Sequence, residues 1–315
     1  MPPSHVTVKA PATTANMGPG FDVFGLALEQ PTDKVMLMPI PEGIKTEVEG
    51  PATETKLELQ GKNAASIVAS QMLKEFSLKI GVLINIKRGI MPGVGLGSSA
   101  ASAAAVAYGL NHIFDLKLDN KQLVRFAAKG EVASAGYEHA DNVSAALCGG
   151  FVIVRSYDPL EVVSMKTPED MQVCVAYPHL KHSANKTEKA RSVVPKQVPI
   201  DKLVYNVGRA AAMVNGFAES NLDLICASMS DAVVEPARAF LIPGYENVRE
   251  SALRAGACSV AISGAGPAMI SIVNKKKADA ATVAHAMKAA FESVGLHATS
   301  FATRPGKGVQ LLEMK

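Results

Sequence analysis

The chain has 315 residues, 48% of them hydrophobic and 19% charged, which is typical of a folded globular protein and excludes an intrinsically disordered one. Its formal net charge is only +3, because 32 Lys and Arg are nearly balanced by 29 Asp and Glu, and this excludes a broad basic surface for nucleic acid. The length favours two packed domains with a cleft between them, with one long domain as the alternative.

Strands dominate the beginning of the chain. Alternating polar and apolar residues, separated by Pro and Gly, predict four strands in an antiparallel arrangement. A helix follows, with Ile67, Met72 and Leu73 among its apolar positions, and then a strand that runs into Lys87 and Arg88. These predicted elements cover residues 5–10, 23–29, 34–40, 44–49, 63–76 and 82–86.

A glycine-rich turn separates these elements from a group of helices. Residues 99–114 are almost all small or apolar, and because Ala dominates and β-branched residues are rare, they predict a buried helix. A second helix is expected over residues 120–134. The pair Gly149 and Gly150 then ends a short helix and introduces a strand over residues 151–155.

The second half of the chain mixes strands and helices and contains no repeat or low-complexity linker. Its element order predicts an α+β fold, and the Pro- and acid-rich residues 167–170 indicate a boundary between domains 1–168 and 169–315. The predicted strands cover residues 171–177, 258–263, 268–273 and a stretch near 297–302; the helices cover 188–194, 201–219, 222–229 and a stretch ending at 294; and a polar loop covers 179–186.

The cysteines and the N-terminus both predict a cytoplasmic protein. Cys148, Cys174, Cys226 and Cys258 lie far apart in apolar or small-residue surroundings, without a CxxC pair. We expect four buried thiols, neither disulfides nor zinc ligands, which fits a reducing compartment. The N-terminus lacks the basic start and apolar run of a signal peptide, and no uncharged apolar stretch reaches the roughly 20 residues needed to span a bilayer.

A glycine-rich segment before the alanine-rich helix has the features of a phosphate-binding turn. Glycine permits backbone conformations closed to other residues, and the free amides at a helix N-terminus carry about +0.5 of an elementary charge. Two serines would supply a helix cap and a magnesium ligand; a capped turn without a ligand is the alternative. The segment consists of Pro92, Gly93, Val94, Gly95, Leu96, Gly97, Ser98, Ser99, Ala100 and Ala101.

This segment differs from the two best-known phosphate-binding loops. In a Walker loop a Lys follows the last glycine, but here Ser98 stands in that place. The glycine spacing does not match the dinucleotide-binding fingerprint either. A different class of phosphate-binding loop is therefore required.

Residues 95–101, Gly-Leu-Gly-Ser-Ser-Ala-Ala, resemble the central motif of the galactokinase, homoserine kinase, mevalonate kinase and phosphomevalonate kinase superfamily. Within it, the chain looks closest to the homoserine kinase family, on residues 10–25, 139–142 and 262–267. These motifs span nearly the whole chain. The resemblance implies an ATP-binding N-terminal domain like ribosomal protein S5 domain 2 and a ferredoxin-like C-terminal domain that contributes substrate-binding residues.

The resemblance also implies where the nucleotide binds. The glycine-rich segment would hold the phosphates of ATP, and backbone amides at Gly264 and Gly266 would lie near the cleft, unless these residues form only a tight hairpin. Asn63 would touch the adenine, although Asn is also a common N-cap. In similar kinases a Glu and a phosphate-loop serine bind Mg²⁺, so Glu131 and Ser99 inherit that role.

An amino-acid-like substrate requires a positive group for its carboxylate and an acidic or carbonyl group for its ammonium. Arg191 and Arg238 would clamp the carboxylate, and Asp22 would face the ammonium. Without the resemblance, both arginines are more readily interpreted as surface or salt-bridged residues, and Asp22 as a turn or cap residue. By resemblance the substrate-binding set is Asn16, Asp22, His139, Thr187, Arg191 and Arg238.

Phosphoryl transfer needs mainly alignment and charge neutralisation, so a general base is dispensable. By resemblance, Asn142 stands where mevalonate-type relatives place an Asp, and an uncharged amide cannot accept the hydroxyl proton as a carboxylate can. We therefore expect Asn142 to orient the hydroxyl while the γ-phosphate takes the proton, with Asp141 as a base in the rival hypothesis. On spacing alone, this cluster is also explained as a loop and a helix cap.

These features together predict a homoserine kinase-like activity that uses ATP and Mg²⁺, in a cytoplasmic protein expected by resemblance to be a homodimer. The alternatives are another small-molecule kinase of the superfamily, such as one for mevalonate or shikimate, and a non-catalytic ATP-binding sensor on the same fold. Asn142 argues against mevalonate, and shikimate lacks the ammonium that Asp22 would serve.

Overall fold

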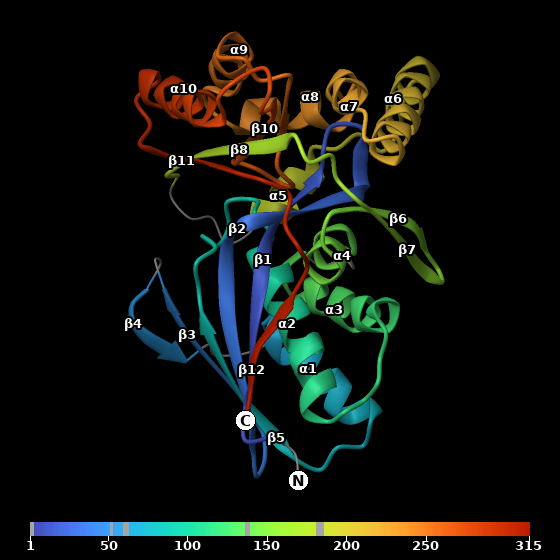
Figure 1. Cartoon of the computed structure of the whole chain (residues 1–315), viewed down its shortest axis with the longest axis vertical. Coiled ribbons are helices and arrows are strands. Elements are labelled where there is room, and N and C mark those ends of the chain that lie inside the picture. Colours follow the sequence, from blue (N-terminus) through green and yellow to red (C-terminus); the bar gives the residue numbers. More distant parts are fainter. Residues whose placement is uncertain (1–2, 51–52, 59–62, 136–138, 181–185) are drawn as a thin grey trace.

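A computed structural model describes residues 3–50, 53–58, 63–135, 139–180 and 186–315. The chain forms two sheets with helices packed against them, shown in the lower and upper halves of Figure 1. Both sheets are largely antiparallel, so the predicted α+β class is confirmed. No helix among the described residues is both long and apolar enough to cross a bilayer.

The first sheet has the strand order β12-β1-β2-β5-β3-β4, with the hairpin β6–β7 attached to β2. Among the described strand pairs, the pairing of β3 with β5 is the one parallel pair. Helices α1 to α4 pack against this sheet, and their apolar residues fill the larger core of the molecule. The strands are β1 (Val6–Asn16), β2 (Gly20–Ile40), β3 (Ile44–Gly50), β4 (Thr53–Glu58), β5 (Gly81–Lys87), β6 (Phe151–Tyr157), β7 (Leu160–Met165) and β12 (Gln310–Met314); the helices are α1 (Ala64–Glu75), α2 (Ser98–Ile113), α3 (Asn120–Ala135) and α4 (Asp141–Cys148).

The second sheet has the order β11-β8-β10-β9 and is antiparallel throughout. A second apolar core lies between this sheet and helices α9 and α10. Figure 1 shows α5 where the two halves of the molecule meet. The elements are β8 (Met171–Pro178), α5 (Lys186–Ser192), α6 (Ile200–Ala218), α7 (Leu222–Ser228), α8 (Val234–Arg238), α9 (Tyr245–Arg254), β9 (Ser259–Ile262), β10 (Met269–Asn274), α10 (Ala280–Ser293) and β11 (Ala298–Thr303).

Most predicted elements are confirmed with shifts of one to three residues at their ends, but two predicted strands are one. Residues 30–33 have the composition of a turn, yet β2 continues through them because Thr32 pairs with Pro11 and Asp33 with Ala10. The buried Asp33 carboxylate also accepts hydrogen bonds from the amides of Gly89 and Ile90, which satisfies its charge inside the sheet.

The sequence patterns did not predict β4, β7, β12, α8 or α9. Helix α9 buries only Val248 and Ala252, so its apolar periodicity is weak. Strand β12 is short and pairs with β1, which returns the end of the chain to the first sheet beside the N-terminus (Figure 1). The boundary between domains 1–168 and 169–315 stays a prediction, with Gln310–Met314 lying outside the second sheet.

The prediction of four free thiols is wrong for two of the cysteines. Cys226 on α7 and Cys258 before β9 form a disulfide, while Cys148 and Cys174 are free. The pair is separated by 32 residues in sequence, and only the packing of α7 beside the start of β9 brings the two Cα atoms to 5.5 Å. Because two of the four cysteines are paired, the cysteines no longer indicate a reducing compartment.

Unfolding the protein without reductant is expected to expose two reactive thiols, and adding reductant should raise the count to four. The reason is that a disulfide survives unfolding, so only Cys148 and Cys174 can react. The measurement is a chromogenic thiol titration in denaturant, with the Cys226→Ser, Cys258→Ser double variant as control. A count of four before reduction would contradict the bond.

Candidate active site

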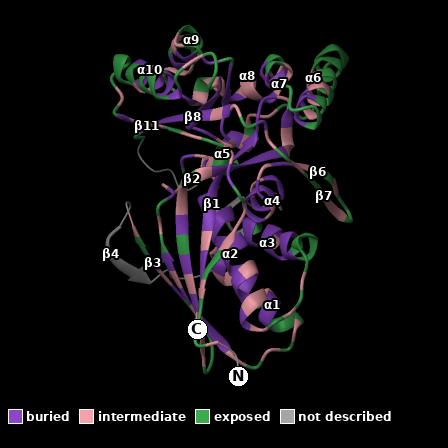
Figure 2. Cartoon of the chain, in the orientation of Figure 1, coloured by how far each residue is buried: buried purple, intermediate pink, exposed green. Residues whose placement is uncertain are grey.

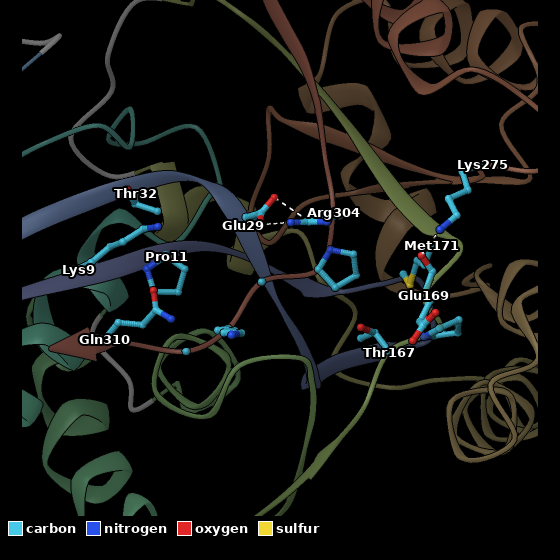
Figure 3. Close-up of a pocket in the computed structure, with 15 residues that line it drawn as sticks. Lys9, Pro11, Glu29, Thr32, Thr167, Glu169, Met171, Lys275, Arg304 and Gln310 are labelled. Carbon is cyan, nitrogen blue, oxygen red and sulfur yellow. Dashed lines mark hydrogen bonds and ion pairs between the residues drawn. The ribbon is translucent and has the colours of Figure 1, made fainter. Parts of the chain in front are cut away.

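Several cavities lie near the junction of the sheets, and one of them gathers most of the predicted site residues. The largest of these, of about 600 Å³, is lined by β1, β2, the connector at 167–169 and the C-terminal segment. Figure 3 shows that an ion pair between Glu29 and Arg304 lies across it, with a distance of 2.6 Å between Oε1 and Nη2. Neither glycine-rich loop lines this cavity, so we do not assign it to the active site.

The second cavity, of about 310 Å³, lies between the β1–β2 turn, the start of α2, helices α4, α5 and α8, and the loop from β9 to β10. Of the predicted site residues, Asn63, Val94, Ala100 and Ala101 do not line it; Asn63 caps α1 through its bond with Ser66, and the two alanines are fully buried in α2. The predicted residues that line it are Asn16, Asp22, Pro92, Gly93, Gly95, Leu96, Gly97, Ser98, Ser99, Glu131, His139, Asp141, Asn142, Thr187, Arg191, Arg238, Gly264 and Gly266.

The glycine-rich segment requires glycine at two positions. Gly97, the N-cap of α2, has φ of 65°, and a Cβ there would lie 2.0 Å from Oγ1 of Thr13 and 3.1 Å from Oδ1 of Asn142. Gly95 has φ of 94°, and its Cβ would lie 2.4 Å from the carbonyl oxygen of Ser263. A side chain at either position would therefore displace the groups that form the cavity wall.

Ser98 does not cap α2 as predicted. No side-chain cap bond is present at this helix start, and the Ser98 hydroxyl instead contacts Nη1 of Arg88. Arg88 also forms an ion pair of 3.3 Å with the buried Asp33. Sequence reasoning placed Arg88 only at a strand end and missed this contact, because its partners come from β2 and α2.

A buried carboxylate lies beside the start of α2. The Ser99 hydroxyl donates to Oε2 of Glu131 at 3.2 Å, and Glu131 is only 6% exposed. Burial raises the pKa of Glu131 to about 7, and the nearby Asp141 carboxyl adds to this effect. No cluster of three or more His, Cys, Asp or Glu side chains suited to a metal occurs in the described part of the chain. One carboxylate and one hydroxyl fit Mg²⁺, which proteins usually hold through one or two carboxylates together with substrate phosphates.

Asn142 is held by bonds on both sides of its amide. Its Oδ1 accepts from the Thr13 hydroxyl at 2.7 Å, and its Nδ2 donates to Oδ1 of Asp141 at 3.1 Å. Burial raises the pKa of Asp141 to about 7, and the Asp22 charge adds to this effect. The arrangement fixes which way the Asn142 amide faces.

The β1–β2 turn places an acid against an arginine and a histidine. Asn16 and Asp22 both have positive φ, 73° and 57°, and the Asn16 Oδ1 accepts from the Asp22 amide at 3.2 Å. The Asp22 carboxylate accepts from Nη1 of Arg191 at 2.9 Å, and its other oxygen lies 3.6 Å from Nδ1 of His139. A negative and a positive group therefore lie side by side in the cavity.

Arg238 on α8 is buried beside this pair but has no carboxylate partner among the described ion pairs. Its Nε donates to the carbonyl of Ala190 at 2.8 Å and its Nη1 to that of Gly264 at 3.0 Å. Its guanidinium also lies 5.0 Å from the centre of the Phe21 ring. These contacts hold the guanidinium fork in place while its positive charge remains available to an anion.

Lys186, at the start of α5, is a further cavity residue that the sequence patterns did not single out. Its ammonium donates to the backbone carbonyls of Gly93 and Gly266. No local motif marks this lysine, because its partners lie 93 and 80 residues away in the chain.

Two family models match the chain: "GHMP kinases N terminal domain" matches residues 63–150 and "GHMP kinases C terminal" matches residues 210–293. A curated relative from Methanococcus vannielii named homoserine kinase is 46% identical over 273 residues, which cover 86% of this chain and 88% of that protein. A homoserine kinase from Haloarcula marismortui is 40% identical over 306 residues, covering 97% and 99%.

Solved structures with a similar fold include a protein named homoserine kinase. The crystal structure of homoserine kinase from Cytophaga hutchinsonii superposes with a TM-score of 0.90 and 35% identity over 98% of each chain. A mevalonate kinase from L. major, at 13% identity and a TM-score of 0.66, shares the fold alone.

Proposed function

The chain belongs to the GHMP kinase family, among relatives named homoserine kinase, and from this premise we propose that it transfers the γ-phosphoryl group of ATP to the hydroxyl of L-homoserine. The product is O-phospho-L-homoserine, and the reaction is a step in threonine biosynthesis. The observation that carries this proposal is one cavity in which a glycine-rich helix start lies close to an amino-acid-shaped set of charges.

The nucleotide end of the site is formed by the start of α2. The amides after Gly97 and the loop at residues 264–266 bind the phosphates of ATP. Glu131 and Ser99 hold Mg²⁺, which neutralises phosphate charge when bound. Asn63 lies outside this cavity, and its contact to the adenine is proposed only from its Nδ2, which is buried without a hydrogen-bond partner in the described structure.

The substrate end recognises a zwitterion. The ammonium of homoserine pairs with Asp22, which releases Arg191 from its present ion pair, and the carboxylate binds Arg191 and Arg238. His139, Asn16 and Thr187 complete the substrate contacts. One ion pair within the protein is thus exchanged for two pairs with the substrate, so a molecule that lacks either charge binds less well.

Asn142 orients the hydroxyl that attacks the γ-phosphorus. Because both sides of its amide are already bonded to Thr13 and Asp141, its remaining lone pair and N–H have a defined direction. The hydroxyl proton passes to the γ-phosphate, and Asp141 serves mainly to hold the amide.

The test is an ADP-release assay with Mg·ATP across homoserine, threonine, serine, shikimate and mevalonate. Preference for homoserine supports both the substrate and the reaction. Turnover with mevalonate or shikimate alone would replace homoserine with another acceptor of the same superfamily. ATP binding without turnover on any acceptor would support a non-catalytic sensor.

We further propose that the enzyme is a cytoplasmic homodimer, with α6 at the interface. Ile200, Val204 and Val207 on this helix are 72%, 65% and 58% exposed, and with Leu203 they form an apolar stripe at helical spacing. Figure 2 shows the exposed side of α6 facing outward at the edge of the molecule. The stripe carries no charge, so two copies related by a twofold axis can bury it against itself.

Val204→Glu is expected to convert the dimer into a monomer at micromolar concentration while leaving the fold intact, because it places a charge at the centre of the buried stripe. Light scattering measures the mass. Leu253→Glu, which alters an exposed leucine on α9, is the matched control and should stay dimeric. A wild-type protein of monomer mass would refute the dimer.

A further inference from the structure

The glycine-rich segment lacks the lysine of a Walker loop, but the fold brings one to it from elsewhere. Lys186 belongs to α5, and its ammonium donates to one carbonyl of each glycine-containing loop, Gly93 and Gly266. It lines the same cavity as Ser98 and Ser99 at the start of α2. A cation therefore lies beside the helix N-terminus at which phosphates are expected.

Like Arg238 and unlike the other cationic side chains of the cavity, Lys186 has no carboxylate partner among the described ion pairs. Arg88 pairs with Asp33 and Arg191 pairs with Asp22, whereas the ion pairs of the described residues include none to Lys186. Two carbonyls solvate its ammonium only in part, since an ammonium has three N–H donors. Burial lowers the pKa of Lys186 to about 8, so at pH 7 the side chain is still mainly charged and an anion would stabilise it.

We propose that Lys186 is a ligand of the terminal phosphates of ATP and supplies, from α5, the cation that the glycine-rich segment lacks. This inference rests on the proposed kinase function. In the free protein the ammonium contacts the two loop carbonyls, and the nucleotide phosphates take over part of this contact. Because Arg191 lies on the same helix, α5 then contacts both the nucleotide and the amino-acid carboxylate.

The experiment compares binding of ATP, ADP and AMP by calorimetry at pH 7 and constant Mg²⁺. Lys186→Met is expected to weaken ATP binding about 20-fold, because one to two charge-assisted hydrogen bonds to the phosphates are lost. AMP binding should stay within about twofold of the wild type. Lys186→Arg keeps the charge and should recover most of the loss. Lys196→Met removes a charge from an exposed position that follows α5 and lines none of the described cavities, and it should bind all three nucleotides like the wild type.

Each outcome separates this inference from the proposed function. If the wild type binds no ATP, the kinase proposal fails. If the wild type binds ATP and Lys186→Met binds it equally well, only the assignment of Lys186 fails. An equal loss for ATP and AMP, or a failure of Lys186→Arg to restore ATP binding, would show that the lysine only holds the two loops together and would overturn the phosphate contact.

Discussion

Replacing Arg238 with methionine is expected to raise the KM for homoserine about 100-fold or more and to leave the KM for ATP within about twofold. The buried guanidinium is held by the carbonyls of Ala190 and Gly264, and no carboxylate neutralises it in the described ion pairs. It is therefore oriented to bind the substrate carboxylate before the substrate arrives. Losing two charge-assisted bonds costs about 3 kcal/mol, which corresponds to a little over 100-fold.

Two further variants and one alternative acceptor distinguish a loss of carboxylate binding from a loss of folded structure. Arg254→Met changes an exposed arginine on α9 and should have no effect on either KM. Arg238→Lys keeps the positive charge but lacks the planar guanidinium fork, so its KM for homoserine should lie between those of the wild type and Arg238→Met. The acceptor 3-aminopropan-1-ol, which is homoserine without its carboxylate, should react equally poorly with wild type and Arg238→Met. An equal rise in both KM values would contradict a role for Arg238 in binding the carboxylate.

The sequence allowed the fold class and most long elements to be predicted, because each depends on local periodicity. Helix α2 is an example: its alanine-rich composition identifies a buried helix without knowledge of any partner. The turn before this helix could also be predicted from the local sequence, because closely spaced glycines indicate backbone conformations that other residues rarely adopt. The resemblance supplied the roles of scattered residues such as Arg191 and Arg238, which no local pattern distinguishes from surface arginines.

What could not be predicted depends on contacts between distant segments. Lys186 reaches a carbonyl 93 residues earlier in the chain, and Cys226 meets Cys258 across the boundary between α7 and β9. Strand β12 is identified only by its pairing with β1. In each case the role of the residue or strand depends on its partner in the fold. The local sequence does not indicate which distant segment that partner belongs to.

Glu131→Gln is expected to lower kcat about 100-fold or more with Mg·ATP while leaving the protein as stable as the wild type, or more stable, at pH 8 in EDTA. An amide cannot replace the negative ligand that Mg²⁺ requires, and metal stabilisation of phosphate charge contributes several kcal/mol. The carboxylate itself is costly to bury, as the rise of its pKa to about 7 by burial indicates. Thermal melting and ADP release on the same preparation measure the two effects.

The combination of lost activity and retained stability distinguishes a metal ligand from a structural residue. A carboxylate that served the fold would lose stability on replacement, because its partner Ser99 would lose a charged acceptor. Glu75→Gln, at an exposed position at the end of α1, is the control and should change neither property. Normal turnover by Glu131→Gln would contradict the role of Glu131 as a Mg²⁺ ligand. A melting temperature well below that of the wild type would instead indicate that the buried carboxylate stabilises the fold around α2.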